Sequence, residues 1–261
     1  MSTSAAFQRA RRPEQKQQRE DAILGAAREL ALRDGVRNVS LNDIAARIGI
    51  HKSALLRYFE TREQIFLELT AASWRDWAQA LHADLDGAAA GSAAATGSAT
   101  TTGSAAATGS ATTTGSATTT GSAATGSATT GSAELVADVV ARSFADRPLL
   151  CDLIPHTALN LERNVSPAAV RRYKLTSLGA VGDAADLVHR VLPELTEGEC
   201  REFISAMASL AGALWQIANP PPVLAELYAT DPDLGHACVD LLPRLRRTAA
   251  VLLAGLIPSR P

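Results

Sequence analysis

The chain has 261 residues, enough for one large domain or two small ones, and its hydrophobic fraction of 46% allows a sizeable buried core. No stretch approaches the ~20 consecutive apolar residues of a membrane span, and the polar, basic N-terminus lacks the apolar segment of a secretion signal. We therefore expect a cytoplasmic protein. The three cysteines, Cys151, Cys200 and Cys238, lie far apart in the sequence, and this spacing favours buried thiols over a metal site.

The net charge of −2 conceals an uneven distribution of charge along the chain. Residues 1–80 contain 13 Lys or Arg and 10 Asp or Glu, whereas the remainder is acidic. The first 19 positions hold five basic residues and one glutamate. This basic end suits either a polyanion partner or a solvated tail, and under both interpretations we expect residues 1–19 to be a disordered arm.

Residues 20–34 predict the first helix, because their apolar positions recur on one face and Gly35 follows the last of them. Residues 40–59, SLNDIAARIGIHKSALLRYF, then predict two short helices separated by a turn, at 41–48 and 52–58. Apolar or small residues give each helix one stripe that can face the other.

The ends of these short helices are also predictable from single residues. Ser40 can accept backbone N–H bonds as an N-cap, and Asp43 completes a capping box. Gly49 suits the left-handed conformation that closes the first helix. A generic helical hairpin inside an all-α core is the alternative interpretation of the pattern.

A long helix is predicted from Thr61 to about Asp86, with Trp74 and Trp77 continuing its apolar stripe toward a second domain. Residues 87–133 are a low-complexity array of GSAxxT units, in which no charge, aromatic or large apolar side chain occurs. Such a segment cannot bury enough surface to offset its ordering entropy, so we expect a flexible insert.

Helical patterning returns after the array and continues to residue 258. The helices that we expect in this region lie at 134–146, 148–162, 167–192, 197–218, 222–229 and 235–257. No segment has the alternating pattern of a strand, so the predicted fold is all-α.

The head and the long helix resemble the tetracycline-repressor (TetR) family of bacterial regulators over about residues 20–70. The residues that carry this resemblance are Asp43, Ile44, Ala45, Gly49, Ile50, Lys52, Leu55, Tyr58, Phe59, Arg62 and Glu63. The chain departs from the family pattern at His51, Ser53 and Leu56, where a Ser or Thr cap, a glycine or other small residue, and a tyrosine are common. The array over 87–133 is also foreign to the family.

The resemblance implies a helix-turn-helix DNA-binding head at 20–70, the end of a connecting helix at 71–86, and a regulatory and dimerisation domain at 134–258. Helix-turn-helix geometry then places Lys52, Ser53 and Arg57 at base edges, with His51 as a further candidate. The residues better placed for phosphates are Ser40, Asn42, Tyr58 and Arg62. Solvent exposure alone is the alternative for each of them.

Family habit also implies a homodimer on a palindromic operator, paired through 197–218 and 235–257, and a small apolar effector that releases the DNA. The candidate effector contacts are His156, Tyr173, Phe203, Met207 and Trp215, each of which could instead be a core residue. No catalytic motif, cofactor site or metal site is expected. A helical interaction module that binds another protein and lacks specific DNA binding is the competing hypothesis.

Overall fold

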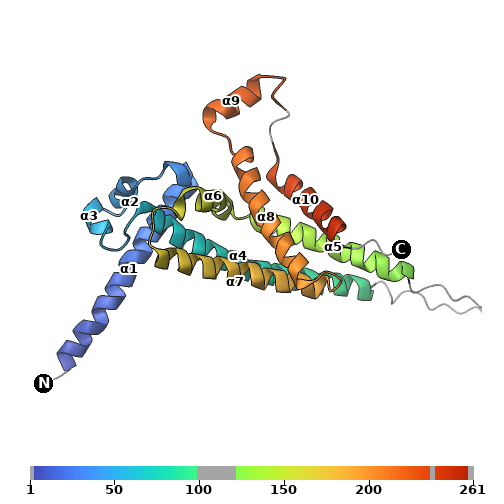
Figure 1. Ribbon diagram of the computed structural model, residues 1–261, viewed down its shortest axis with the longest axis horizontal. Helices are drawn as coiled ribbons and strands as arrows, with labels where there is room; N and C mark the ends of the chain where they lie inside the picture. The colour runs from blue at the N-terminus through green and yellow to red at the C-terminus, as the bar shows by residue number, and fades with distance from the viewer. Residues whose placement is uncertain (1–2, 99–121, 236–238, 258–261) are drawn as a thin grey trace, which may run out of the picture.

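The computed structural model describes residues 3–98, 122–235 and 239–257, and these residues are helical with no strand among them. Within these ranges no helix combines the length and the apolarity that crossing a membrane requires. A small head and a larger C-terminal bundle share one long helix (Figure 1).

The head consists of three helices, one short 3₁₀ turn and the start of the long helix. Their bounds are α1 Thr3–Asp34, η1 Val36–Asn38, α2 Leu41–Arg47, α3 Lys52–Leu55 and α4 Arg62–Ser98. The side chains that hold it together are fully or almost fully buried: Ile23, Leu30, Val36, Ile44, Leu55 and Ile65. Two ion pairs on its surface, Arg47–Glu29 at 2.6 Å and Arg28–Asp76 at 3.3 Å, tie α1 to α2 and α4.

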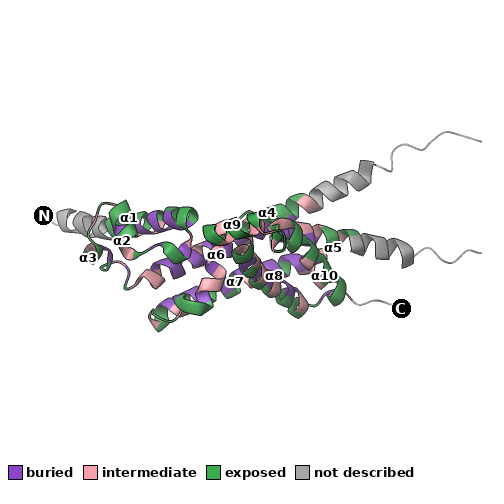
Figure 2. Cartoon of the chain, turned by 90° about the horizontal axis from the view of Figure 1, so that it is seen from above, coloured by how far each residue is buried: buried purple, intermediate pink, exposed green. Residues whose placement is uncertain are grey.

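The remaining helices follow α4 in the chain, and all of them except α9 form a bundle around it. Their bounds are α5 Ser122–Ala145, α6 Pro148–His156, η2 Thr157–Leu161, α7 Pro167–Val191, α8 Glu197–Ala218, α9 Pro222–Thr230 and α10 Leu241–Leu256. Buried residues run without a break from the head into this bundle (Figure 2).

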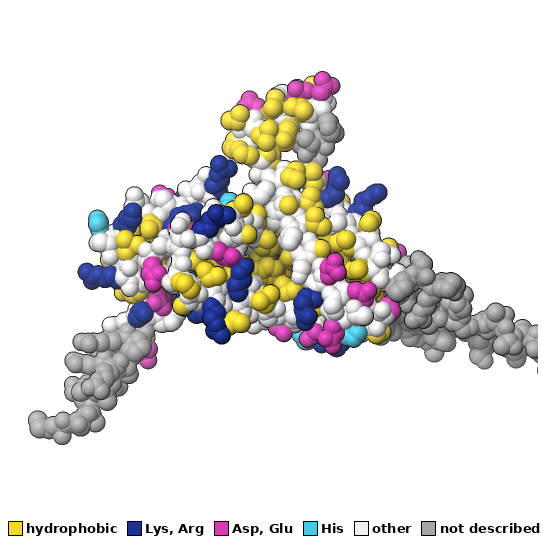
Figure 3. Space-filling model, viewed as in Figure 1, with side chains coloured by type: hydrophobic (Ala, Val, Ile, Leu, Met, Phe, Trp, Pro, Cys, Tyr) yellow, Lys and Arg dark blue, Asp and Glu magenta, His cyan; other side chains and the backbone are white. Residues whose placement is uncertain are grey.

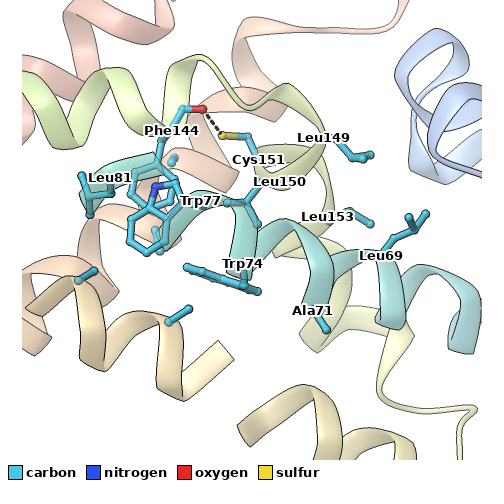
Figure 4. Packing of buried hydrophobic residues seen from close by; sticks show 14 of the residues in the cluster. Leu69, Ala71, Trp74, Trp77, Leu81, Phe144, Leu149, Leu150, Cys151 and Leu153 are labelled. Carbon is cyan, nitrogen blue, oxygen red and sulfur yellow. Dashed lines mark hydrogen bonds between the residues drawn. The ribbon is translucent and has the colours of Figure 1, made fainter. Parts of the chain in front are cut away.

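An aromatic cluster fixes α4 against α5 (Figure 4). The Trp77 ring stacks on Phe144 with centroids 4.8 Å apart and meets Trp74 edge-on at 5.3 Å. The Trp77 indole donates a hydrogen bond to Ser143 Oγ at 2.9 Å, which satisfies a buried N–H. The predicted continuation of the apolar stripe along α4 is therefore confirmed, and the stripe packs against α5.

Cys151 belongs to the same cluster, and its thiol donates to the Phe144 carbonyl at 3.2 Å. Cys151 and Cys200 are both buried and free. Burial, with the nearby Asp152 carboxylate, raises the pKa of Cys151 to about 12, so this thiol has little thiolate character. Cys238 lies outside the described residues.

Several expected boundaries differ from the structure, and α10 begins at Leu241 where we expected a helix from residue 235. α1 begins at Thr3 where we expected a disordered arm, and α4 continues to Ser98 beyond the expected end at Asp86. α5 begins at Ser122, so both edges of the low-complexity array are helical. An alanine-rich segment extends a helix that is already nucleated more easily than it starts one. The centre of the array, residues 99–121, lies outside the described residues.

α9 stands apart from the bundle, and none of its residues is buried. Val223 is 82% exposed and Leu227 is 43% exposed. The lobe that α9 forms has hydrophobic side chains over much of its visible surface (Figure 3).

Candidate nucleic-acid interface

The capping box at the start of α2 fixes the first part of the site. Ser40 Oγ accepts from the Asp43 N–H at 3.3 Å, and the Asp43 carboxylate accepts from the Ser40 N–H at 2.8 Å and from its hydroxyl at 2.6 Å. These bonds from Ser40 lower the pKa of Asp43. The predicted cap is confirmed, and it sets the angle at which α2 enters the head.

The turn between α2 and α3 depends on Gly49, which has φ +68° as predicted. The Gly49 N–H donates to the Ala46 carbonyl at 3.2 Å, and the Ile50 N–H donates to the Ala45 carbonyl at 3.0 Å. This pair of bonds is a Schellman closure, which needs a left-handed residue at the glycine position.

His51 caps α3, the role that Ser or Thr commonly fills in the family. Its Nδ1 accepts from the Ser53 N–H at 3.2 Å and lies 2.8 Å from Ser53 Oγ. In the neutral ring the proton must then lie on Nε2, which leaves that N–H as a donor for a ligand outside the head.

α3 is shorter than expected, because regular helix ends at Leu55 and not near Tyr58. The Arg57 N–H donates to Ala54 and the Tyr58 N–H to Leu55, so the chain tightens into three-residue turns. Buried Leu55 and Phe59 hold this segment against the core, and the exposed Leu56 and Arg57 side chains between them face outward.

Most of the residues that we expected at DNA lie on the surface of the head. Ser40, Asn42, His51, Lys52, Ser53 and Arg57 are exposed, and Tyr58 is half-buried. Within the described residues Lys52 and Arg57 form no ion pair, whereas neighbouring Arg47 is paired with Glu29. Lys and Arg side chains occur around the head end of the molecule in Figure 3.

Arg62 requires a correction, because its guanidinium points into the head. It donates to the carbonyls of Val36 and Val39, and it lies 4.5 Å from the centroid of the Phe66 ring. Burial lowers the pKa of Arg62. This side chain joins the α1–α2 connection to α4, and the geometry does not support the phosphate contact that we expected.

The five candidate effector contacts fall into two groups. Tyr173, Phe203 and Met207 are buried in the packed core, at 7%, 1% and 0% exposure. His156 and Trp215 instead line a cavity of about 650 Å³ between the head and the helices α6 and α8.

Asp152 is the residue at this junction that the sequence analysis missed. Its Oδ2 accepts from the Val36 N–H at 2.7 Å, and its Oδ1 accepts from Gln216 Nε2 at 2.8 Å. It therefore connects α6 to both the head and α8. The sequence offered one local signal for this residue, the four-residue spacing of Asp152 and His156 on α6. Its other partners, Val36 and Gln216, are distant from Asp152 in sequence.

Two family models match the chain. The model described as bacterial regulatory proteins, tetR family, matches residues 23–69, and the model described as tetracyclin repressor-like, C-terminal domain, matches residues 110–260. A search of curated proteins finds no match. TetR family regulators are generally non-enzymatic DNA-binding proteins. Because the second match alone spans more than half of the 261 residues, the chain belongs to the TetR family and is a DNA-binding transcriptional regulator.

Proposed function

We propose that this regulator is a repressor that binds a palindromic operator as a homodimer and leaves it when a small-molecule effector binds. The observation that carries the proposal is the geometry of the head. A capped α2, a glycine turn and a capped α3 present exposed Lys52 and Arg57, without ion pairs among the described residues, at one end of the molecule.

We assign Lys52, Ser53 and Arg57 to base edges, with the Nε2 donor of His51 as a fourth contact. The residues assigned to phosphates are Ser40, Asn42 and Tyr58. Arginine pairs with two acceptors of guanine at once, whereas a phosphate contact positions the head without reading sequence.

Dimerisation through α8 and α10 is supported by faces of these helices that stay uncovered in one protomer. On α8, Ala213 and Ile217 are exposed, and on α10, Ala250, Val251 and Ala254 are exposed. Small residues allow two helices to approach closely, and a two-fold axis would bring these faces together as four helices. Two heads on one dimer then meet two half-sites of a palindrome.

Repression follows if the operator overlaps a promoter. We place this regulator in the cytoplasm, because a bacterial regulator that acts on chromosomal DNA works there.

The test is to incubate the purified protein with genomic fragments of its own source, recover bound DNA, and measure affinity for the recovered fragment over a range of salt concentrations. We expect affinity to fall steeply with salt because lysine and arginine displace counterions from phosphates.

Arg57→Ala should weaken binding by about 1–3 kcal/mol and relax base preference at one position of each half-site. The matched control is Arg163, an exposed arginine just after η2 in the bundle, and Arg163→Ala should leave affinity unchanged. Failure to retain any fragment at low salt would refute the proposal, and an equal loss across all sequences would reject base reading by Arg57.

A further inference from the structure

The cavity between the head and the bundle is built by segments that are distant in sequence. The end of α1 and η1 form one side, α6 forms the floor, and the end of α8 with the following prolines forms the other side. Its volume of about 650 Å³ falls within the ~300–1,000 Å³ that is usual for small-molecule sites. The inference below rests on the proposed function and specifies its effector.

Part of the lining is apolar. Leu149 is 8% exposed, the Trp215 ring is half-buried, and Pro220, Pro221 and Pro222 follow the end of α8. Rigid rings of this kind offer a flat surface to an aromatic or aliphatic group at low entropic cost.

The rest of the lining is polar, and its two carboxylates already have partners. Asp34 accepts two hydrogen bonds from Arg33, at 2.8 and 2.6 Å. Asp152 accepts from the Val36 N–H and from Gln216, and its Oδ1 lies 3.7 Å from His156 Nε2. Both oxygens of each acid therefore already accept a hydrogen bond.

The remaining charged group is Arg37, which is exposed and forms no ion pair within the described part of the chain. His156 also lines the cavity, and burial lowers its pKa, which favours the uncharged ring. The lining thus holds two arginines and two carboxylates, which balance in charge, and Arg37 is the charged side chain among them that has no partner within the described residues.

We infer that this cavity binds a small amphipathic organic anion, with its apolar body against Trp215 and the prolines and its carboxylate or similar group on Arg37. A guanidinium presents paired donors that match a carboxylate. The ligand class differs from the purely apolar effector that the sequence suggested, because the lining is mixed.

Such a ligand contacts the head and the bundle at once, beside the bond from Val36 to Asp152. If it fits one arrangement of head and bundle better than another, it shifts the protein toward that arrangement. Linkage then requires the ligand and the DNA to change each other's affinity by the same factor.

The binding test uses the full-length protein and a matched pair of probes, 2-naphthoate and its neutral analogue 2-naphthylmethanol, in isothermal titration. We expect one naphthoate site per chain and weaker binding of the alcohol. Arg37→Gln should weaken naphthoate about tenfold and leave the alcohol almost unchanged, since only the charged pair is lost. Trp215→Leu should weaken both probes.

Arg171→Gln on the exposed face of α7 is the control and should change neither affinity. The inference would be overturned if the two probes bound equally well or if Arg37→Gln left the naphthoate affinity unaltered. It would also be overturned if benzoate, 2-naphthoate and octanoate all failed to bind at millimolar concentration. Operator affinity measured without any probe tests the DNA-binding proposal separately, because Arg37 is not among the residues assigned to DNA.

Discussion

Two arginines five positions apart in the head have opposite environments. Arg57 is exposed beyond the end of α3, whereas Arg62 turns inward and donates to the backbone of the α1–α2 connection. Sequence reasoning assigned Arg57 to a base edge, because it lies on the second short helix, and Arg62 to a phosphate, because it lies at the start of the next helix. It could not distinguish them, since the carbonyls that Arg62 contacts lie 23 and 26 residues earlier in the chain.

This difference predicts opposite results from two substitutions. Arg62→Leu should lower the free energy of unfolding by about 1–3 kcal/mol, because it leaves two carbonyls without their charged donor. Arg57→Ala should change stability by less than about 0.5 kcal/mol, as expected for a surface site, while weakening DNA binding. Chemical denaturation of both variants measures this, and an unaltered stability in Arg62→Leu would contradict the role given to its guanidinium.

Among the elements, the short helices of the head depend on their end residues more than on their length. α2 has 7 residues and α3 has 4, both too short to persist alone in water. The cap of α2 was predicted because Ser40 and Asp43 lie three positions apart, whereas the cap that His51 gives α3 was not, because histidine is not among the preferred N-cap residues. The early start of α1 and the late end of α4 could not be predicted, because a helix that is already formed continues into neighbouring residues without a local signal.

Gly49 gives a test of the turn between α2 and α3. An added Cβ would meet nothing within 4 Å, so the cost of Gly49→Ala comes from the backbone at φ +68°. We expect a loss of about 1–2 kcal/mol and a smaller loss for Gly49→Asn, since asparagine tolerates this conformation. Thermal unfolding of the two variants compares them, and equal losses would point to a cause other than φ.

α8 begins with a second capping box, formed by Thr196 and Glu199, and together with the box of α2 it predicts a dependence on acid. Bonds from Ser40 lower the pKa of Asp43, and bonds from Thr196 lower the pKa of Glu199. A carboxylate with a lowered folded-state pKa stabilises the protein above its ordinary pKa and loses this effect as pH falls through the folded value.

Asp43→Asn and Glu199→Gln should therefore be less stable than the unmodified protein at pH 7, with the gap closing as the pH is lowered from the ordinary carboxyl range of about 4 through the folded values. Urea titrations across this range provide the measurement. A gap that stays constant with pH would mean that the carboxylate charge contributes nothing to either cap.

At the scale of the whole molecule, the sequence predicted the class of fold but not the junction between its parts. Apolar periodicity was sufficient to identify the bundle helices, because it reports which face of each helix is buried. The Val36–Asp152 bond joins residues 116 positions apart, and no local pattern encodes such a pairing. The same limit applies to the effector contacts, where only His156 and Trp215 of the five share a cavity.

The proposed dimer is tested by introducing charge on the uncovered face of α8. Ala213→Glu would place two carboxylates close together across the two-fold axis, and we expect the dimer dissociation constant to rise by about 100-fold. Ala168→Glu, at an exposed site in the first turn of α7, is the control. Sedimentation equilibrium reports both, and a dimer unaffected by Ala213→Glu would place the interface elsewhere.

The helix that both parts share has a mechanical consequence. α4 has 37 residues, which at the usual rise per residue span about 55 Å. It begins inside the head at Arg62, and its later turns pack between α5 and α7. A tilt of α4 by a few degrees within the bundle would therefore move the end of the helix that lies in the head by several ångströms. In the proposed dimer the two copies of α3 must stay about one DNA turn apart, roughly 34–36 Å, and that displacement alone would end their match to the grooves.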